Sequence, residues 1–385
     1  MKRRRLVSLL GGTALAPLAA ARAATPARAE PADRCTVPPV RGDGWLTATA
    51  DDYRSIDRAA LCRMADRLAT ASEVHSVVVA RSGRLAFERY FSGPDEVFSR
   101  RVRDVIFDAD TLHDMKSVSK SVASLAVGIA LEQGLIRSVD QPILDFFPEL
   151  SDMRSPERDR LLLSHALTMS MGLRWIEAAP DTEGDNDEDR MRRAADPCRY
   201  VLGLPATAPP GQEFFYNTGT LALVSAIMRK ATGRPLDEFA RTTLFEPLGI
   251  ERWEWKRYRG DSDAGGGLRL RPRDMAKIGQ LVLGGGSWNG RQVVPRAWLD
   301  ASMVPRYKAS NTYDYGYLWW LGHASYTGRE DRWDAALGRG GQSIRIVPGL
   351  DLVIAVTAGY YQDYSERAFQ LQRDIFRDIL RAVSA

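Results

Sequence analysis

Two segments that favour β-strands stand near opposite ends of the chain. Ser76 to Tyr90 contains two β-prone runs separated by Arg81-Ser82-Gly83, and Ser343 to Thr357 contains two more separated by Pro348-Gly349. Apolar, β-branched runs on either side of such turn residues predict β-hairpins. We therefore expect one sheet that is built from both ends of the chain, with a helical insertion between its strands.

Helical periodicity marks much of the remaining sequence. Apolar residues at helical spacing predict a helix within 52–71, and 364–383 has the pattern of an amphipathic helix. Residues 140–240 read as mostly helical with long connections. The expected fold class is α/β of the α+β kind, with an antiparallel sheet flanked by N- and C-terminal helices and a mostly helical inserted domain. The expected boundaries are 51–116 and 241–385 for the sheet domain and 117–240 for the helical domain.

The N-terminus has the three parts of an export signal. Lys2 to Arg5 is basic, Leu6 to Leu18 is apolar but too short for a stable membrane span, and Ala21-Arg22-Ala23 fits a cleavage site. The arginine run also fits a twin-arginine signal loosely. We expect residues 1–23 to be a signal peptide, residues 24–50 to be a linker, and the mature protein to be periplasmic or secreted without a stable membrane span.

The basic balance of the chain belongs to this N-terminal segment. The chain has 53 Lys and Arg against 49 Asp and Glu, a formal net charge of +4. Five of the 53 cations lie in the first 23 residues, which contain no acid, so the remainder has 48 cations against 49 acids. Binding to nucleic acid requires a basic footprint on the folded domain. We therefore expect no nucleic-acid partner.

Cysteine and histidine spacing gives no metal-binding motif. The three cysteines form no C-x-x-C pair, and the four histidines form no H-E-x-x-H motif. In an oxidising compartment, three cysteines allow one disulfide and one free thiol, with three unpaired thiols as the alternative, and the pairing stays open. We predict no metal and no cofactor, and we assign the histidines no catalytic role. The residues concerned are Cys35, Cys62, Cys198, His75, His113, His165 and His323.

The first candidate for chemistry is the segment Ser117-Val118-Ser119-Lys120. Positions i and i+3 share a helix face, so Ser117 Oγ and Lys120 Nζ can meet. A serine needs an adjacent base to become a good nucleophile, and a buried lysine with a lowered pKa can be that base. Free N–H groups at the helix N-terminus would stabilise developing negative charge. The motif is common by chance, but only Lys120 among the lysines follows a serine at this spacing.

Two further segments contain residues suited to the same site. Tyr216 follows the turn residues Pro209-Pro210-Gly211, and a tyrosine beside a Ser/Lys pair can relay protons to a leaving group. The segment from Gly338 to Gln342 precedes an apolar strand, and its glycines would let the backbone approach a ligand closely. An N–H group there could complete an oxyanion hole with the N–H of Ser117. Each segment taken alone is more typical of a structural turn.

Taken together and in order, these three motifs resemble those of the serine β-lactamase and penicillin-recognising family. Within that family, the chain is most similar to the esterase and class C-like branch, and in particular to the 6-aminohexanoate-dimer (nylon-oligomer) hydrolases. The resemblance implies a β-lactamase/transpeptidase-like fold. Other stretches that match are Ile143–Leu150, Ala166–Met169, Leu244–Gly249 and Gly267–Asp274.

The resemblance implies a role for each matched residue. Ser117 would be the nucleophile, Lys120 the base that activates it, and Tyr216 the proton relay. The N–H groups of Ser117 and Gln342 would form the oxyanion hole. The substrate-binding residues that the resemblance implies are Gly340, Gly341, Arg339 and Trp175.

The chain departs from the family pattern in three places. Arg339 replaces a Lys or His, Asn217 directly follows Tyr216 where the family has Tyr-x-Asn, and no Ser-Asp-Asn occurs in the middle block. Lactam and D-alanyl peptide substrates carry a carboxylate that these positions usually hold, although Arg339 could also grip a carboxylate. We therefore expect a serine hydrolase of an ester or amide, similar to 6-aminohexanoate-dimer hydrolase or a carboxylesterase.

Two alternatives to this function stay open. One is a D-alanyl carboxypeptidase or β-lactamase that acts on cell-wall peptides or lactams, and the other is a non-catalytic ligand-binding member of the same fold. The absence of G-x-S-x-G disfavours a nucleophile-elbow hydrolase. The expected partner is a small-molecule or short-peptide ester or amide. We expect the following aromatic residues to belong to the core: Tyr315, Tyr317, Trp319 and Trp320.

Overall fold

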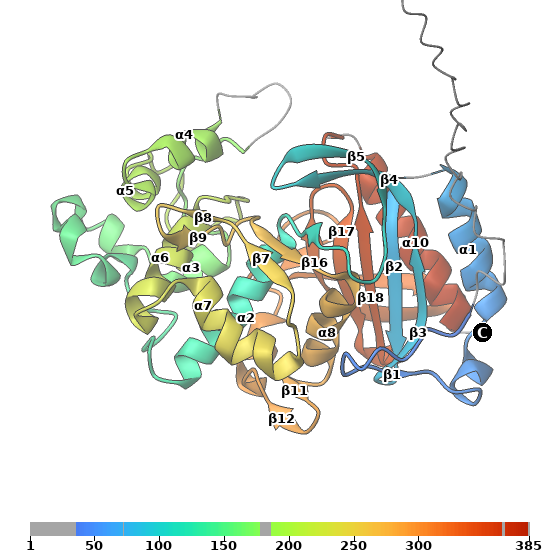
Figure 1. Cartoon of the computed structure of the whole chain (residues 1–385). Coiled ribbons are helices and arrows are strands. Elements are labelled where there is room, and N and C mark those ends of the chain that lie inside the picture. The colour runs from blue at the N-terminus through green and yellow to red at the C-terminus, as the bar shows by residue number, and fades with distance from the viewer. Residues whose placement is uncertain (1–35, 72, 178–185, 364–365, 384–385) are drawn as a thin grey trace, which may run out of the picture. The chain divides into compact units, whose positions relative to one another are not determined.

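The structure is a computed structural model that describes residues 36–71, 73–177, 186–363 and 366–383. The predicted signal peptide and the first part of the predicted linker lie outside these ranges. Residues 37–385 form one compact unit (Figure 1). Among the helices in the described ranges, none combines the length and the apolar character that a membrane crossing needs.

A nine-stranded sheet joins the two ends of the chain, as the hairpin pattern predicts. Its central contact is the antiparallel pair of β2 and β18, in which Val79 lies opposite Ile354 (Figure 1). All neighbouring strands are antiparallel except β1, which runs parallel to β3. In spatial order the strands are β1 (Leu46–Thr47), β3 (Arg84–Tyr90), β2 (Val74–Arg81), β18 (Leu352–Ala358), β17 (Gln342–Val347), β16 (Arg329–Gly338), β15 (Trp320–Tyr326), β14 (Asp314–Tyr315) and β13 (Tyr307–Lys308).

Helices cover both faces of this sheet, which explains why its central strands are apolar on both sides. On β17, Ile344 faces helix α8 (Pro272–Leu283), where a Cβ on Gly279 would lie 2.9 Å from the Ile344 side chain. The next residue, Arg345, has its guanidinium 4.8 Å from the ring of Phe376 on helix α10 (Arg367–Val383). Helix α10 packs beside helix α1 (Arg58–Ala71), so the two predicted terminal helices flank the same face (Figure 1).

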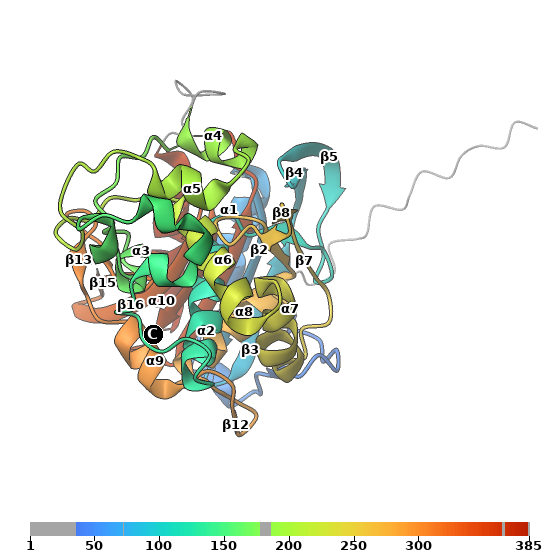
Figure 2. The same ribbon diagram turned by 90° about the vertical axis from the view of Figure 1, so that its left-hand side faces the viewer.

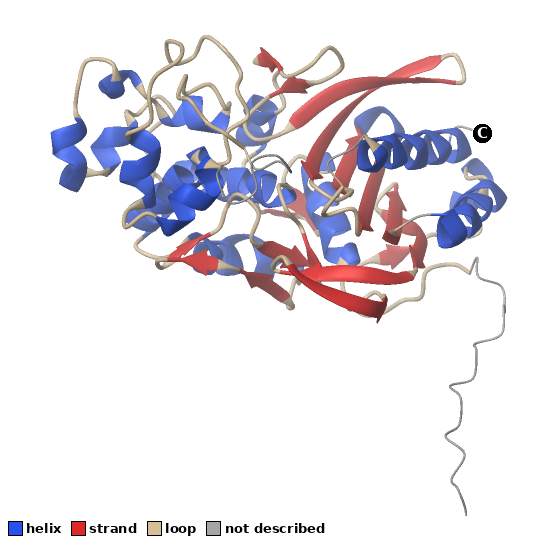
Figure 3. Cartoon of the chain, turned by 90° about the horizontal axis from the view of Figure 1, so that it is seen from above, coloured by secondary structure: helices blue, strands red, loops and turns tan. Residues whose placement is uncertain are grey.

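The middle of the chain forms a group of helices around α2 (Val118–Glu132), as Figure 2 shows. In Figure 3, helices gather at the left of the view and the long strands lie at its centre and right. Nearly all of α2 is buried, and Gly128 lets Trp298 pack against it, since a Cβ there would lie 2.1 Å from the indole ring. The surrounding helices are α3 (Leu163–Leu167), α4 (Asp187–Arg193), α5 (Pro197–Leu202), α6 (Thr220–Thr232), α7 (Leu236–Ala240) and α9 (Arg296–Ser302).

Short strands connect this helical group to the sheet. A small sheet of β6 (His113–Asp114), β10 (Leu268–Leu270) and β7 (Trp253–Trp255) stands next to the start of α2. The hairpin of β4 (Ser92–Val97) and β5 (Arg100–Ile106) projects beside it (Figure 1). The remaining short pairs are β8 (Arg257–Tyr258) with β9 (Asp261–Ser262) and β11 (Ser287–Trp288) with β12 (Arg291–Gln292).

The predicted linker of residues 24–50 needs a correction in its described part. Trp45 is buried, its indole N–H donates to the carbonyl of Arg273, and the adjacent β1 pairs with β3. This part of the segment therefore belongs to the sheet. Burial of the large apolar side chain of Trp45 stabilises it there, whereas a solvated linker would leave that side chain exposed to water. The predicted domain boundaries at 117 and 241 stay predictions.

The cysteines differ in state. Cys62 on α1 is disulfide-bonded. Cys198 on α5 is a free thiol, and burial raises its pKa to about 12.

Candidate active site

Ser117 and Lys120 meet at the start of helix α2. Ser117 is the residue just before the helix, and Lys120 lies one turn later on the same face. Lys120 Nζ donates to Ser117 Oγ at 2.8 Å and to the carbonyl oxygen of Gly265 at 2.6 Å. Lys120 is only 2% exposed, so its amine has little access to bulk water. A neutral amine that gives one hydrogen to Gly265 would present its lone pair to the Ser117 hydroxyl.

The other serines of this helix have structural contacts. Ser119 Oγ donates to the carbonyl of Lys116 at 2.7 Å and accepts from the N–H of Leu268. Ser121 Oγ donates to the carbonyl of Leu318 at 2.6 Å. Both hydroxyls are therefore engaged with backbone groups, and Ser117 alone among the three contacts a lysine amine.

The residue before Ser117 holds the turn in a conformation that L-residues seldom adopt. Lys116 has φ of 48°, and its ammonium forms ion pairs with Glu96 at 3.1 Å and Asp114 at 3.3 Å. A non-glycine residue in the left-handed region costs free energy, and such residues often occur at active sites. The two ion pairs hold this turn in place, and so they fix the position of Ser117 at the N-terminus of α2.

Tyr216 stands next to this pair, as the second motif predicts. Lys120 Nζ lies 5.2 Å from the centre of its ring. On its other side, the ring stacks on Trp320 with centroids 5.9 Å apart. Trp320 is half-buried and packs against the core, whereas the other aromatic residues predicted for the core are fully buried there, namely Tyr315, Tyr317 and Trp319.

Ser117 and Lys120 line a cavity of about 660 Å³. Phe98, in the turn between β4 and β5, forms one part of its wall. Further parts of the wall come from α4, from the segment 256–267 and from Arg339. Of the four predicted substrate-binding residues, only Arg339 lines this cavity. A substrate of small-molecule size fits a space of this volume.

Gln342, whose backbone N–H is the predicted second oxyanion donor, lies at the start of β17, and this role stays a prediction. Gln342 is fully buried on β17, its side-chain N–H donates to the carbonyl of Ala358, and it does not line the Ser117 cavity. Gly338, which is paired with Gln342 across the hairpin, is the residue that reaches the nucleophile. A Cβ on Gly338 would lie 3.2 Å from Ser117 N. The glycine-rich turn therefore brings its first glycine close to the nucleophile, with Gln342 as that glycine's partner across the hairpin.

Gly340 and Gly341 have a structural role in the turn, and their predicted substrate contact stays a prediction. Their φ angles are 81° and 98°, which L-residues rarely adopt. A Cβ on Gly340 would lie 2.7 Å from the ring of Tyr361, and one on Gly341 would lie 2.8 Å from Ala358. These two glycines close the turn between β16 and β17 against the neighbouring chain.

Trp175 does not line the cavity but contacts Glu177, which does. It is buried against Gly219, where a Cβ would lie 2.4 Å from its ring, and its indole N–H donates to Glu177. Glu177 lines the cavity and accepts a hydrogen bond from Thr218 Oγ1 at 2.6 Å. Sequence reasoning missed Glu177, because an isolated carboxylate two residues after a tryptophan has no distinctive spacing.

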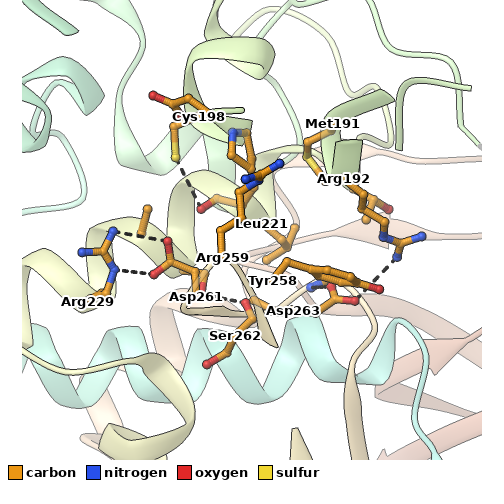
Figure 4. A pocket seen from close by; sticks show the side chains of 18 of the residues that line it. Met191, Arg192, Cys198, Leu221, Arg229, Tyr258, Arg259, Asp261, Ser262 and Asp263 are labelled. Carbon is orange, nitrogen blue, oxygen red and sulfur yellow. Dashed lines mark hydrogen bonds and ion pairs between the residues drawn. The ribbon is translucent and has the colours of Figure 1, made fainter. Parts of the chain in front are cut away.

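A second pocket of about 290 Å³ adjoins the first. The two share Arg192, Tyr258 and Asp263, and Figure 4 shows the guanidinium of Arg192 directed at Asp263 beside the Tyr258 ring. Cys198 lies in this second pocket. Because burial raises its pKa to about 12, the thiol is protonated at neutral pH and is a poor nucleophile.

Two of the histidines, which are isolated in the sequence, come together in the fold. His75 Nδ1 lies 3.4 Å from His113 Nδ1, and Asp95 completes the one group of residues in the described ranges that could hold a metal ion. His75 Nε2 contacts the carbonyl of Pro94, and Asp95 accepts from the hydroxyl of Tyr361. Burial lowers the pKa of His75 to about 4. These contacts describe a neutral, hydrogen-bonded network in the core, outside the Ser117 cavity.

Comparison with known proteins agrees with this geometry. The β-lactamase family model matches residues 64–374. The 6-aminohexanoate-dimer hydrolase of Paenarthrobacter ureafaciens is 26% identical over 293 residues, which are 72% of this chain and 74% of that protein. Esterase EstB of Burkholderia gladioli is 27% identical over 181 residues, which are 45% of this chain and 44% of the esterase.

Solved structures share the fold. A putative 6-aminohexanoate-dimer hydrolase from Bacillus anthracis superposes with a TM-score of 0.66 at 22% identity, over 82% of this chain and 80% of that one. EstCE1, a hydrolase with promiscuous acyltransferase activity, superposes with a TM-score of 0.66 at 14% identity, over 88% of this chain and 100% of its own.

Proposed function

The chain belongs to the β-lactamase family and is a serine hydrolase, and from that premise we propose that it cleaves an ester or amide bond through an acyl-enzyme on Ser117. The observation that carries the proposal is the 2.8 Å hydrogen bond between Lys120 Nζ and Ser117 Oγ. It places the Lys120 amine, which is the proposed base, within hydrogen-bonding distance of the hydroxyl that must lose its proton.

The reaction has two steps. Lys120 takes the proton of Ser117 as Oγ attacks the carbonyl carbon, and the C–O or C–N bond to the leaving group then breaks. Tyr216, whose ring lies beside the Lys120 amine, delivers a proton to the leaving group and takes in its place the proton that Lys120 removed from Ser117. Water then attacks the acyl-enzyme by the reverse route and regenerates the Ser117 hydroxyl.

The oxyanion of each tetrahedral intermediate needs two N–H donors. The N–H of Ser117 is one of them. We propose the N–H of Gln342 as the other, and the approach of Gly338, its partner across the hairpin, to Ser117 N supports this proposal. Donors of this kind typically contribute about 10²–10³ in kcat each.

The similarity to 6-aminohexanoate-dimer hydrolase and to EstB favours small esters or amides as substrates. Hydrolysis of lactams or D-alanyl peptides is the second candidate, and Arg339 at the cavity wall is the observation that favours it, because a guanidinium can bind their carboxylate.

We test the proposal by intact mass after exposure to a fluorophosphonate and by turnover of a short p-nitrophenyl ester. Wild type is expected to gain one adduct and to hydrolyse the ester, whereas Ser117→Ala does neither. The exposed Ser151 provides a matched control, Ser151→Ala, which should behave as wild type. Full ester turnover by Ser117→Ala would disprove the mechanism. A stable adduct without turnover would favour a non-catalytic binding role.

We also propose that the protein is exported. The basic, apolar and small-residue parts of residues 1–23 support this, and so does the disulfide at Cys62, since disulfides persist in oxidising compartments. Mass spectrometry of the protein from the periplasm and the culture medium should find a chain that starts near residue 24. A full-length chain confined to the cytoplasm would contradict export.

A further inference from the structure

Lys256 is a cation in the Ser117 cavity that the proposed reaction does not use. It lines the cavity wall and is half-buried. Its N–H donates to the carbonyl of Gly267 at 2.9 Å, and its own carbonyl accepts from the N–H of Asp263 at 2.7 Å. The segment held in this way contains Gly265, whose carbonyl accepts from Lys120. The backbone of Lys256 is therefore fixed to the same segment that positions the base.

The ammonium of Lys256 contacts aromatic faces. Nζ lies 4.9 Å from the centre of the Tyr258 ring and 6.0 Å from that of Phe98. Neither ring carries a counter-charge, and no carboxylate in the described ranges forms an ion pair with Lys256. Cation–π contacts hold an ammonium in place without neutralising it. The charge of Lys256 is therefore held at the wall of the cavity and can act on a ligand.

The other cations at this wall are already engaged. Lys116 is paired with Glu96 and Asp114, and Lys120 bonds to Ser117. Arg192 is paired with two carboxylates of the cavity, Glu188 and Asp263 at 3.5 Å (Figure 4). Arg339 also has a partner.

The carboxylates of the cavity are equally satisfied. Asp114 is paired with Arg269 at 2.9 Å, and Glu177 accepts from Thr218. Asp189 accepts from the side chain of Asn186 at 3.1 Å. An ammonium group on a ligand would thus compete with existing donors, whereas an anionic group would meet Lys256.

We propose that Lys256 forms an anion subsite that binds a carboxylate of the substrate cleaved at Ser117. This inference rests on the proposed function for the identity of the reaction, and it narrows the substrate class to anionic esters or amides. Hydrogen bonds to charged groups contribute more than neutral ones, enough for an effect of about tenfold or more on affinity.

The test measures binding separately from turnover. Calorimetry compares adipate with its uncharged counterpart adipamide on the full chain. In parallel, kcat/KM is measured for mono-p-nitrophenyl adipate and for p-nitrophenyl hexanoate, which share a six-carbon acyl chain and differ in the terminal carboxylate. The variants are Lys256→Met, which removes the charge, and Lys256→Arg, which keeps it. Lys308→Met removes a charge from an exposed lysine and serves as the matched control.

For Lys256→Met we expect the affinity for adipate, and the ratio of kcat/KM between the anionic and the neutral ester, to fall by about tenfold. Lys256→Arg should restore most of both, and Lys308→Met should change neither. Added salt should weaken adipate binding to wild type more than to Lys256→Met. Unchanged adipate affinity and an unchanged ratio in Lys256→Met would overturn the subsite. Loss of adipate binding in Lys256→Met, in a protein without Ser117 labelling, would support the subsite and reject the hydrolase.

Discussion

Lys120 donates hydrogen bonds to Ser117 Oγ and to the carbonyl of Gly265. A test of its role as a base therefore needs a substitution that keeps the donors but cannot accept a proton. Lys120→Arg keeps a positive charge and several donors, but a guanidinium does not deprotonate at accessible pH. If Lys120 is the base, both Lys120→Arg and Lys120→Ala should lower the acylation rate by about 10²–10⁴ while the fold is retained. Stopped-flow release of p-nitrophenol, with circular dichroism as the folding check, measures this. Acylation by Lys120→Arg at near the wild-type rate would reduce Lys120 to a positioning residue.

The residues predicted from the sequence differ in kind from those that were missed. Ser117 and Lys120 share one helical turn, so their contact follows from a spacing of three. Lys256 follows strand β7, far from Ser117 in the sequence, and its backbone is held beside the same cavity by hydrogen bonds with Asp263 and Gly267. No local pattern distinguishes Lys256 from a surface lysine. Its significance arises only from the structure, which places the rings of Phe98 and Tyr258 near its ammonium and pairs it with no acid in the described ranges.

At the scale of elements, the site depends on how closely β16 approaches the start of α2. Gly338 ends β16, and a Cβ there would lie 2.5 Å from the carbonyl oxygen of Met115 and 3.2 Å from Ser117 N. Gly338→Ala must therefore push the strand and the helix apart and displace an oxyanion donor. We expect kcat to fall by about 10²–10³ in ester-hydrolysis assays. Gly93→Ala on β4 is the control, because a Cβ there meets no atom within 4 Å. Equal activity of the two variants would contradict this reading of the third motif.

The third motif also shows where sequence reasoning about elements fails. The cluster of glycines predicts a close approach of the backbone to a ligand, and in the structure these glycines approach other parts of the chain closely. The sequence does not reveal which glycine makes which approach, because β16 and β17 are related by a register that depends on the length of the turn. Here Gly338 pairs with Gln342, so Gly340 and Gly341 face Tyr361 and Ala358 while Gly338 faces the nucleophile.

For the whole molecule, the pairing of the two chain ends was predictable because both contain strong hairpin signals, and β2 with β18 forms that contact. The packing between β2 and β6 was not predictable from the sequence, because no shared periodicity links the residues that meet there. It buries His75 and His113 side by side, 38 positions apart in the sequence. The fold thus places two titratable rings in its core. Their burial affects how the free energy of unfolding depends on pH, which the sequence around either histidine does not indicate.

Those buried histidines predict acid sensitivity. Burial lowers the pKa of His75 from 6.5 to about 4, and burial also lowers that of His113. Between about pH 6.5 and 4 the unfolded chain therefore binds more protons than the folded one, so the free energy of unfolding should fall as pH falls through this window. Each histidine contributes at most about 1.4 kcal/mol per pH unit. Burial raises the pKa of the neighbouring Asp95, which opposes this trend at the acidic end.

Urea unfolding at several pH values between 7 and 4.5 measures the slope. His75→Gln removes one of the rings, so it should flatten the dependence of unfolding free energy on pH even if it lowers stability at pH 7. His323→Gln replaces an exposed histidine and is the matched control, with the wild-type slope expected. The comparison rests on slopes and not on absolute stability, so a general loss of packing in His75→Gln does not obscure it. A wild-type slope retained by His75→Gln would show that the proton uptake occurs elsewhere in the molecule.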